Sequence, residues 1–243
     1  MKEIDAKGTY YKQLNEEIRD ILRNGENEVH LKNVNGQRYI GGGLKMDSKI
    51  VIEGVPGNDL ASFMDGLTIV VNSNGQDGIA NTMNSGKVVI RGDAGDVLGY
   101  GMRGGKLFIK GNVGYRVGIH MKAYYDIRPL VIVGGSARDF LGEYMAGGVL
   151  IVLGMDGEDE VAGDFIGTGM HGGVIYLRGS VEDYQLGKEV GVEEPTYEEK
   201  EEIRGYLEEF CIDVGMDLKD VLSEDFVKLT PKSSRPYGNL YAY

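Results

Sequence analysis

The residues that could carry acid–base chemistry lie beside glycine-rich stretches. Four carboxylates, Asp93, Asp96, Asp139 and Glu143, occupy such positions. Two carboxylates held in one special environment can act as general acid and base or bind a metal ion. These four recur at equivalent places of a repeated sequence pattern, whereas a catalytic pair needs one distinct environment. We therefore interpret them as solvated corner residues.

Nucleophilic chemistry would require a serine in the pattern Gly-x-Ser-x-Gly, which presents the hydroxyl on a sharp turn. Ser136 lies in "GGSAR", which lacks the last glycine, so we interpret it as a turn residue. A free-standing esterase is thus an alternative without a supporting motif. His120 and His171 lie near the end of one repeat and the start of another, and we expect both to be structural.

Cofactor chemistry has equally little support. Stretches such as "GDAGDVLGYG" are similar to dinucleotide-binding loops, but such a loop must follow a strand and open a helix. Here another strand is predicted within a turn, which favours a repeat corner. The single cysteine, Cys211, excludes an internal disulfide and a cysteine-rich zinc or iron–sulfur site supplied by this chain alone. The sequence therefore predicts no catalytic, cofactor-binding or metal-binding residue in this chain.

Composition restricts the class of protein. The chain has 243 residues, of which 42% are apolar, and a formal net charge of −12. This acidity disfavours nucleic acid or an anionic membrane as partner, because phosphate binding needs a basic face. No stretch approaches the roughly 18 apolar residues of a membrane span, and the opening "MKEIDAKGTYYK" lacks the apolar core of a signal peptide. We expect a cytoplasmic location.

A repeat accounts for the glycine content, which is 39 of 243 residues against a typical ~7%. Methionines mark the repeat at intervals of 18, 19, 19, 19, 24 and 25 residues. The best-kept units are "MNSGKVVIRGDAGDVLGYG" and "MRGGKLFIKGNVGYRVGIH". The marking residues are Met46, Met64, Met83, Met102, Met121, Met145 and Met170.

Each unit contains a short β-branched or apolar run, such as "KVVIR", "KLFIK" or "VLIVL", which reads as a strand bounded by glycines. Stacked turns of about 19 residues would pair these strands and align inward aliphatic columns, with the methionines filling one column. The pattern predicts an all-β solenoid, a parallel β-helix of about seven turns over residues 41–190. Turn glycines with positive φ or close backbone approach are expected at Gly92, Gly104, Gly105, Gly111, Gly147, Gly148, Gly154, Gly172, Gly173 and Gly179.

Helical caps are predicted at both ends of the solenoid. Residues 1–40 form an N-terminal helix and cap, in which apolar residues from Tyr11 to Leu22 have helical spacing and Gly25 follows as a stop. Residues 191–243 form acidic helices and an extended tail. Thr196 and Glu199 make a capping-box pattern before an apolar stripe that ends at Gly215. A second short helix follows, and the tail beyond Pro231 lies along the rod or reaches a neighbouring subunit.

Insertions in a solenoid project from one side and often mark its contact face. The longer units place extra residues in "AYYDIRP" (123–129) and "MDGEDEVAG" (155–163), and a neutral excursion is as compatible with them as a partner contact. Candidate subunit contacts are Glu143, Tyr144, Tyr124, Tyr125 and Arg235.

The repeat resembles the C-terminal domain of the glutamate synthase large subunit, the GXGXG domain, a right-handed β-helix of seven turns. The most specific segment is "GSARDFLGEYMAGGVLIVLG" (135–154), and "GDAGDVLGYGMRGGKLFIKG" (92–111) and "GDFIGTGMHGGVIYLRG" (163–179) are also similar. The resemblance covers about residues 40–190. The length departs from a full large subunit, so the chain looks like the β-helix module encoded as a separate polypeptide.

This resemblance implies a non-catalytic structural subunit of a glutamate synthase-type complex. Its expected partners are a glutamine amidotransferase subunit and a flavin and iron–sulfur synthase subunit, which would hold the FMN and the cluster. A homo-oligomer is also possible. The same fold resembles the C subunit of formylmethanofuran dehydrogenase, which is the rival interpretation. "EYMAGG", the acidic C-terminal helix and "FVKLTP" fit the glutamate synthase version better.

Overall fold

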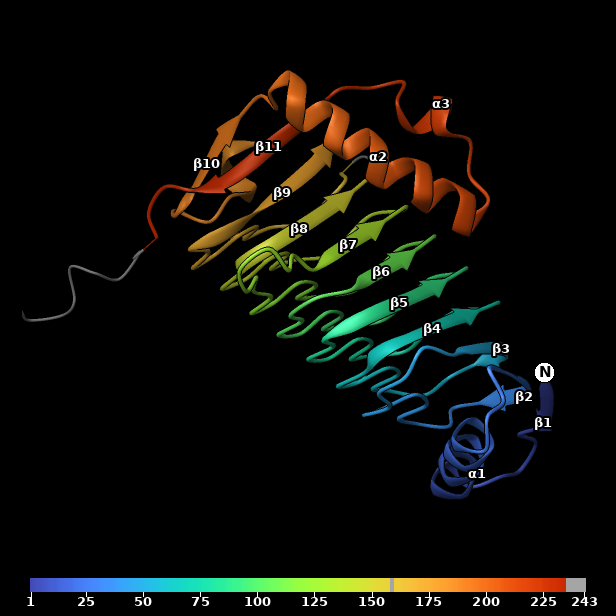
Figure 1. Cartoon of the computed structure of the whole chain (residues 1–243). Helices are drawn as coiled ribbons and strands as arrows, with labels where there is room; N and C mark the ends of the chain where they lie inside the picture. Colours follow the sequence, from blue (N-terminus) through green and yellow to red (C-terminus); the bar gives the residue numbers. More distant parts are fainter. Residues whose placement is uncertain (158–159, 235–243) are drawn as a thin grey trace, which may run out of the picture.

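The protein is described by a computed structural model that covers residues 1–157 and 160–234. Over these residues, eleven strands form one sheet, which winds into an elongated rod with helices near its two ends (Figure 1). The strands are β1 (Lys2–Asp5), β2 (Glu28–Asn35), β3 (Lys49–Val55), β4 (Asp65–Val71), β5 (Ser85–Ile90), β6 (Lys106–Ile109), β7 (Leu130–Val133), β8 (Ala146–Val152), β9 (Gly172–Arg178), β10 (Val190–Glu193) and β11 (Phe226–Pro231). The helices are α1 (Tyr11–Arg23), η1 (Asp183–Gln185), α2 (Tyr197–Val214) and α3 (Leu218–Val221).

Strands β1 to β9 are parallel and follow one another in chain order. Each connection runs through bends and returns the chain one position further along the rod, so the architecture is the predicted parallel β-solenoid. Seven strands, β3 to β9, have six connections between them, which makes about six turns. The prediction of about seven differs slightly because it counted repeat units, each with its own strand, instead of connections.

The strands form because their β-branched and aliphatic residues line up between turns. Ile50, Ile69 and Val88 are register partners in successive strands and are fully buried. The same column continues through β6 to β9, and a parallel column two residues further on is equally buried. Because burying one such side chain contributes about 1.5–3 kcal/mol, these two columns supply much of the stability. Their remaining members are Leu107, Val131, Leu150, Ile175, Ile52, Val71, Ile90, Ile109, Val133, Val152 and Leu177.

The methionines fill a third inward column, as predicted, because six of them are completely buried. The glycine three residues after a methionine makes room for the methionine of the preceding turn. A Cβ on Gly105 would lie 2.5 Å from Met83 Cε, and a Cβ on Gly173 would lie 2.6 Å from Met145 Cε. Methionine and glycine therefore recur together because the methionine of one turn packs against the glycine of the next. The six residues are Met64, Met83, Met102, Met121, Met145 and Met170.

The predicted helices at both ends of the chain are confirmed. In α1, Leu14, Ile18 and Leu22 are buried. In α2, the capping box of Thr196 and Glu199 is formed, and Gly215 ends the helix with φ +71°. Helix α3 is a single turn.

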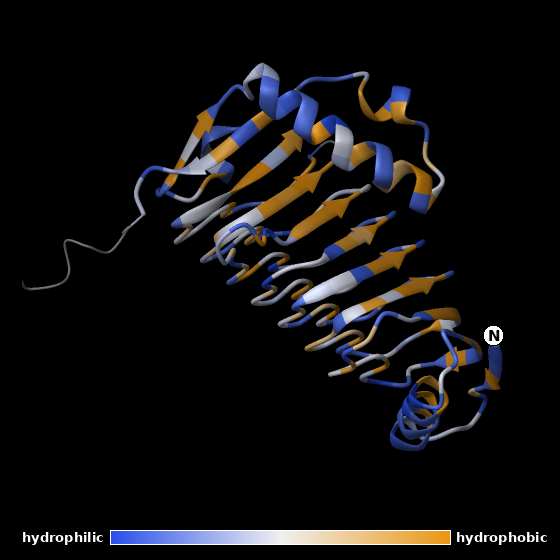
Figure 2. Cartoon of the chain, viewed as in Figure 1, coloured by the Kyte–Doolittle hydropathy of each residue, from blue (hydrophilic) through white to orange (hydrophobic). Residues whose placement is uncertain are grey.

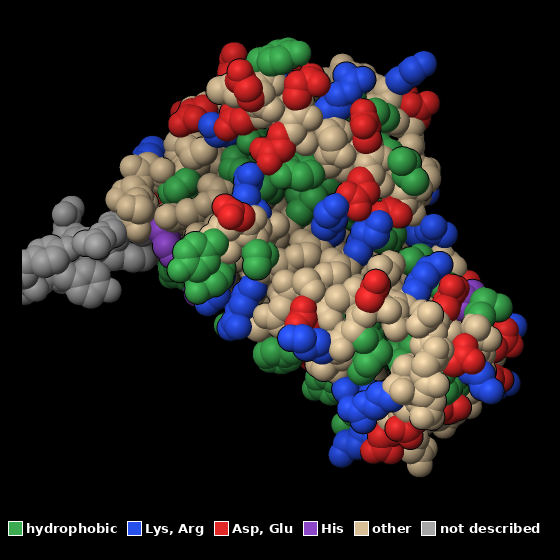
Figure 3. All heavy atoms as spheres, in the orientation of Figure 1, with side chains coloured by type: hydrophobic (Ala, Val, Ile, Leu, Met, Phe, Trp, Pro, Cys, Tyr) green, Lys and Arg blue, Asp and Glu red, His purple; other side chains and the backbone are tan. Residues whose placement is uncertain are grey.

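The placement of α2 differs from the expected end cap, because it lies across the outer face of the sheet (Figures 1 and 2). Many outward residues of β5 to β9 are apolar as well, including Val89, Phe108 and Ile151. They form a second hydrophobic core with the apolar stripe of α2, in which the Phe108 and Phe210 rings meet edge to face with centroids 5.6 Å apart. The sheet is therefore covered on both faces over these strands, which leaves the acidic side of α2 outward (Figure 3).

Two antiparallel strands close the C-terminal end of the rod. Strand β11 pairs with β9, and β10 pairs with β11. The segment "FVKLTP", which was predicted as part of a tail, thus covers the free edge that β9 would otherwise present. At the other end, β1 and β2 continue the parallel sheet below β3, and α1 packs beside β2.

Ion pairs hold α2 against the sheet. Lys87 and Lys106 are register partners in β5 and β6. Lys87 Nζ lies 2.6 Å from Asp213 and 3.3 Å from Glu209, and Lys106 pairs with the other oxygen of Glu209. Burial raises the pKa of Glu209, but the hydrogen bond and charge of Lys106, aided by Lys87, outweigh it, and the pKa lies below its usual 4.5.

This lowered pKa predicts acid sensitivity. A carboxyl whose pKa is depressed by folding stabilises the fold above its unfolded pKa and loses that contribution as the pH falls through the folded value. We therefore expect the free energy of unfolding to fall as the pH drops below about 4.5. Urea unfolding followed by circular dichroism at several pH values measures this. Glu209→Gln is expected to have a shallower decrease between neutral and acidic pH, and an equal decrease in both proteins would contradict the role of Glu209.

Candidate functional site

One edge of the rod consists of connections with an unusual backbone. Each contains three alternating residues at positive φ, for example Val97 (+60°), Gly99 (+66°) and Gly101 (+55°). The middle residue of each triplet is buried and is always glycine or alanine, because a larger side chain would enter the core. A Cβ on Gly142, for instance, would lie 2.6 Å from Ile175 Cδ1. The triplets are 39/41/43, 59/61/63, 78/80/82, 97/99/101, 116/118/120, 140/142/144 and 165/167/169.

Most outer positions of these triplets are not glycine, and several carry bulky side chains despite the cost of this conformation, about 1–2 kcal/mol for a residue with a Cβ. Phe140 and Phe165 stack with their ring centroids 4.9 Å apart, and Arg116 Cζ lies 4.5 Å from the centre of the Phe140 ring. In a second column, His120 stacks on Tyr144 at 5.3 Å. Strained residues that persist on a surface suggest a function for their side chains.

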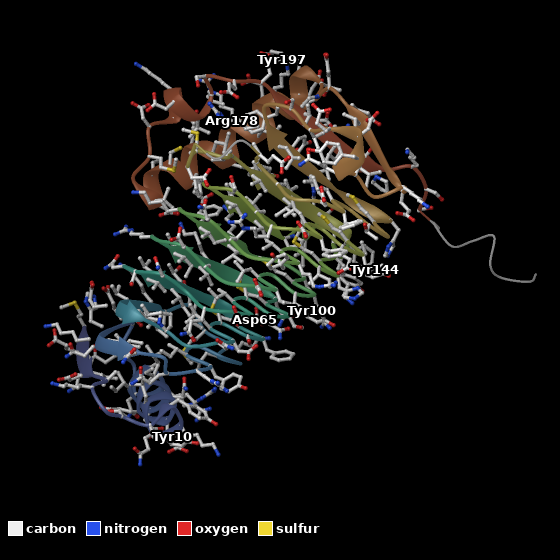
Figure 4. The ribbon with its side chains drawn as sticks, turned by 180° about the vertical axis from the view of Figure 1, so that it is seen from behind. Tyr10, Asp65, Tyr100, Tyr144, Arg178 and Tyr197 are labelled. Carbon is white, nitrogen blue, oxygen red and sulfur yellow. The ribbon has the colours of Figure 1, made fainter. Side chains whose placement is uncertain are left out.

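Tyr100 extends the second column, because its ring meets the His120 ring edge to face at 5.6 Å. Tyr100 and Tyr144 lie on the same edge of the rod (Figure 4). Together the two columns form a surface that we call the aromatic stripe. It consists of Arg116, Phe140 and Phe165 in one column and Tyr100, His120 and Tyr144 in the other.

Glu143 supports this stripe from beneath. It is only 7% exposed and forms an ion pair with Arg116 Nη1. The pair holds the guanidinium of Arg116 over the Phe140 ring, where a cation is attracted to the aromatic face. Of the residues predicted to contact a subunit, Glu143 therefore lies below the surface while Tyr144 lies within it.

The other predicted contact residues lie elsewhere. Tyr124 and Tyr125 are in the segment between β6 and β7, which projects from the side of the rod (Figure 1). They are 66% and 85% exposed, and their rings meet edge to face. Arg235 lies outside the residues that the structure describes.

The carboxylates considered for acid–base chemistry form hydrogen bonds to the backbone of the next turn. The N–H of Asn112 donates to Asp93 Oδ1 (2.8 Å), and the N–H of Tyr115 donates to Asp96 Oδ1 (2.9 Å). Asp139 accepts in the same way from Asp164 (3.1 Å). These side chains therefore connect successive turns, as repeated corner residues would.

The predicted turn glycines fall into three groups. Those at positive φ are Gly105, Gly148, Gly154, Gly173 and Gly179. Gly92 and Gly111 stack directly on the side-chain oxygens of Asn74 and Asp93, where a Cβ would overlap them. The backbone of the preceding turn would collide with a Cβ on Gly104, Gly147 or Gly172.

The remaining candidate groups also have structural contacts. Ser136 is buried, and its hydroxyl donates to Asp156 (2.9 Å). His171 Nδ1 lies 3.1 Å from the carbonyl of Gly169, and His120 belongs to the aromatic stripe. Within residues 1–157 and 160–234, no three histidine, cysteine, aspartate or glutamate side chains come together to hold a metal ion. Over the same part of the chain, no helix is long and apolar enough to cross a membrane.

Comparison with known proteins supports the fold and shows the family. A family model described as the GXGXG motif matches residues 10–234. The chain belongs to the GXGXG motif family. The resemblance to the C-terminal domain of the glutamate synthase large subunit is thus confirmed at the level of the family. This GXGXG protein contains no complete Gly-x-Gly-x-Gly sequence, yet the alternating backbone persists with Arg, Phe, His and Tyr at the outer positions.

One curated protein and one solved structure are similar to this GXGXG protein. An uncharacterized protein of Methanocaldococcus jannaschii is 50% identical over 248 residues, covering 98% of this chain and 95% of the relative. A chain of the formyltransferase/hydrolase complex from Methylorubrum extorquens, solved in complex with methylofuran, has a TM-score of 0.60 and 23% identity. That match covers 82% of this chain and 71% of the other, and it shows a shared fold.

Of the six members of the stripe, sequence reasoning predicted only Tyr144 as a contact residue and interpreted His120 as structural. Arg116, Phe140 and Phe165 follow one another at 24 and 25 residues, the same intervals that separate the later methionines. Each lies two residues before the glycine at the middle of its triplet. Aligning the repeat units on that glycine would have predicted the column.

Proposed function

We propose that this protein is a non-catalytic structural subunit of a glutamate synthase-type complex, in which it holds a glutamine amidotransferase subunit and a flavin and iron–sulfur synthase subunit together. The observation that carries this proposal is the aromatic stripe, a row of stacked, partly exposed rings on strained backbone. Aromatic residues and arginine are enriched where protein subunits meet. Family membership and the segment "GEYMAGG" support the glutamate synthase type.

The architecture suits a spacer. Six turns at about 4.8 Å each extend ~29 Å, and the side-chain hydrogen bonds between turns keep that length fixed. A stiff rod holds two partner sites at a defined distance, as transfer of ammonia from one to the other requires. In this proposal FMN and the iron–sulfur cluster are held by the partners, since one cysteine cannot ligate a cluster that needs several thiolates.

The test is copurification from the source cells. The tagged chain is expected to retain an amidotransferase and a flavoprotein with an iron–sulfur cluster, and the assembly is expected to form glutamate from glutamine and 2-oxoglutarate. A chain that purifies alone from cells that contain both partners would overturn the proposal.

A variant tests the role of the aromatic stripe. Phe140→Gly/Phe165→Gly removes two rings while glycine accepts the positive φ at both sites, so the fold is expected to remain stable within about 1 kcal/mol. Partner retention is expected to fall about tenfold, measured as the ratio of copurified subunits. Tyr197→Ala is the control, because Tyr197 is 75% exposed and lies away from the stripe (Figure 4). Equal retention by both variants would exclude the stripe as the contact surface.

A second candidate has one specific observation in its favour. The fold is shared with a chain of a formyltransferase/hydrolase complex, so this protein would instead be a component of an enzyme of the formylmethanofuran dehydrogenase type. The same copurification separates the two functions. Molybdopterin-containing or formyltransferase subunits among the partners would support this candidate and reject the first.

A further inference from the structure

A groove lies beside the segment between β6 and β7. Its volume is about 540 Å³. One wall is that segment, with Tyr124 and Ile127 exposed by 66% and 54%. The floor is a column of residues that each follow a core methionine by one position. The residues that line the groove are Asp65, Asn84, Ser85, Arg103, Lys122, Ala123, Tyr124 and Ile127.

Two cations are stacked in neighbouring turns on this floor. The N–H of Arg103 donates to Met83 (2.9 Å), and the N–H of Lys122 donates to Met102 (3.0 Å), so the two side chains leave the rod about 4.8 Å apart at their backbones. Like charges held this close to one another repel each other.

No neutralising partner for these cations is seen. Among residues 1–157 and 160–234, neither side chain has an ion pair or a hydrogen bond. The acidic residue that lines the groove, Asp65, is already bonded to Ser85 (2.6 Å) and Lys45 (3.1 Å). Both cations are exposed at the groove, in a chain whose net charge is −12.

The same chain shows how such a pair is satisfied. Lys87 and Lys106 are likewise stacked in neighbouring turns, where they lie in β5 and β6, and there Glu209 and Asp213 of α2 neutralise them. On that face the acidic segment belongs to the chain itself and packs its apolar side on the neighbouring core. The groove repeats this arrangement, two stacked cations beside an exposed apolar wall, without the acidic segment.

We propose that an acidic segment of a partner subunit binds this groove. Its carboxylates pair with Arg103 and Lys122, and its apolar side chains contact Tyr124 and Ile127. The groove is therefore a second contact, separate from the aromatic stripe. This inference names the chemistry of a partner and so rests on the proposed function for its biological setting.

The first experiment uses the purified chain. A fluorescein-labelled peptide of alternating aspartate, glutamate and tyrosine residues is titrated and its anisotropy recorded at low and high salt. Arg103→Glu/Lys122→Glu is expected to weaken binding about tenfold or more. Lys7→Glu/Lys12→Glu changes the net charge by the same amount at exposed sites and is expected to bind as the wild type does. Equal binding by both double variants would overturn the inference, and melting temperatures verify that both are folded.

The second experiment uses the complex. With a photo-crosslinking residue in place of Tyr124, the crosslinked peptide is expected to come from another subunit and to be rich in aspartate and glutamate. Exchanging two of its carboxylates for lysine is expected to restore retention by Arg103→Glu/Lys122→Glu. A neutral or basic segment, or a second copy of this chain, would overturn the inference.

The two proposals can fail separately. If the complex assembles equally well with Arg103→Glu/Lys122→Glu, the groove inference fails while the proposed function stands. If the copurified partners are not an amidotransferase and a flavoprotein, but an acidic segment of one of them crosslinks at position 124, the proposed function fails while the groove inference stands.

Discussion

Phe210→Ala is expected to lower the free energy of unfolding by about 3–5 kcal/mol. The Phe210 side chain is fully buried between α2 and the sheet, and its ring meets Phe108 edge to face. Removing it loses the transfer energy of the ring and leaves a cavity that a stiff sheet cannot collapse to fill. Urea unfolding of the purified protein measures the change.

Ile212→Ala provides the matched control. Ile212 lies on the same helix two residues later but is 81% exposed, so its truncation is expected to change the free energy of unfolding by no more than about 0.5 kcal/mol. Similar small changes for both variants would mean that α2 does not pack on the sheet. That result would contradict the second hydrophobic core.

Gly105→Ala is expected to lower the free energy of unfolding by about 2–4 kcal/mol. Gly105 has φ +81°, which an L-residue adopts at a cost. Its Cβ would also lie 2.7 Å from the carbonyl oxygen of Gly86 and 2.5 Å from Met83 Cε. The methionine can move, but the carbonyl belongs to the backbone of the preceding turn, so the two turns must separate.

The control for this variant measures the cost of the positive φ alone, without contact between turns. Gly36 has φ +79°, and a Cβ there would have nothing within 4 Å. Gly36→Ala is therefore expected to cost only about 1 kcal/mol. If the two alanine variants unfold at the same urea concentration, contact between turns is not what requires glycine at position 105.

The repeat could be read from the sequence because it is dictated by local rules. The intervals between methionines give the length of a turn, and each short apolar run gives its strand. Because these features recur in every turn, a misinterpretation of one turn is revealed by comparison with the others. The predicted number of turns exceeded the observed number by about one because the prediction counted repeat units, each with one strand, whereas turns are the connections between strands.

The position of α2 could not be read in this way. Its capping box and apolar stripe predict the helix itself, but the surface that it covers depends on Val89, Phe108 and Ile151, which point away from the first core. Within an apolar run such as "KLFIK", periodicity does not distinguish the two faces of a strand that is buried on both sides. Strand β11 was missed because its partner, β9, lies about 50 residues earlier in the chain.

The candidate site was predictable only in part. The family resemblance of "GEY" led to the prediction that Glu143 and Tyr144 contact a subunit. In the structure the two side chains have different roles, because Glu143 is buried beneath Arg116, whereas Tyr144 stacks on His120. The rest of the aromatic stripe comes from residues 20 to 25 positions apart. Only the stacking of turns brings such residues into contact, so finding them requires the repeat units to be aligned and cannot rest on one local motif.

The antiparallel closure by β11 affects how the molecule is made. Each parallel strand from β2 to β9 pairs with the strand before it, so the turns can form one at a time while the ribosome is still synthesising the chain. Throughout that interval the newest strand exposes hydrogen-bonding groups to which another nascent chain could add. β11 covers β9 only after residues 226–231 have emerged, so protection against such misassembly is encoded after all the strands that it protects.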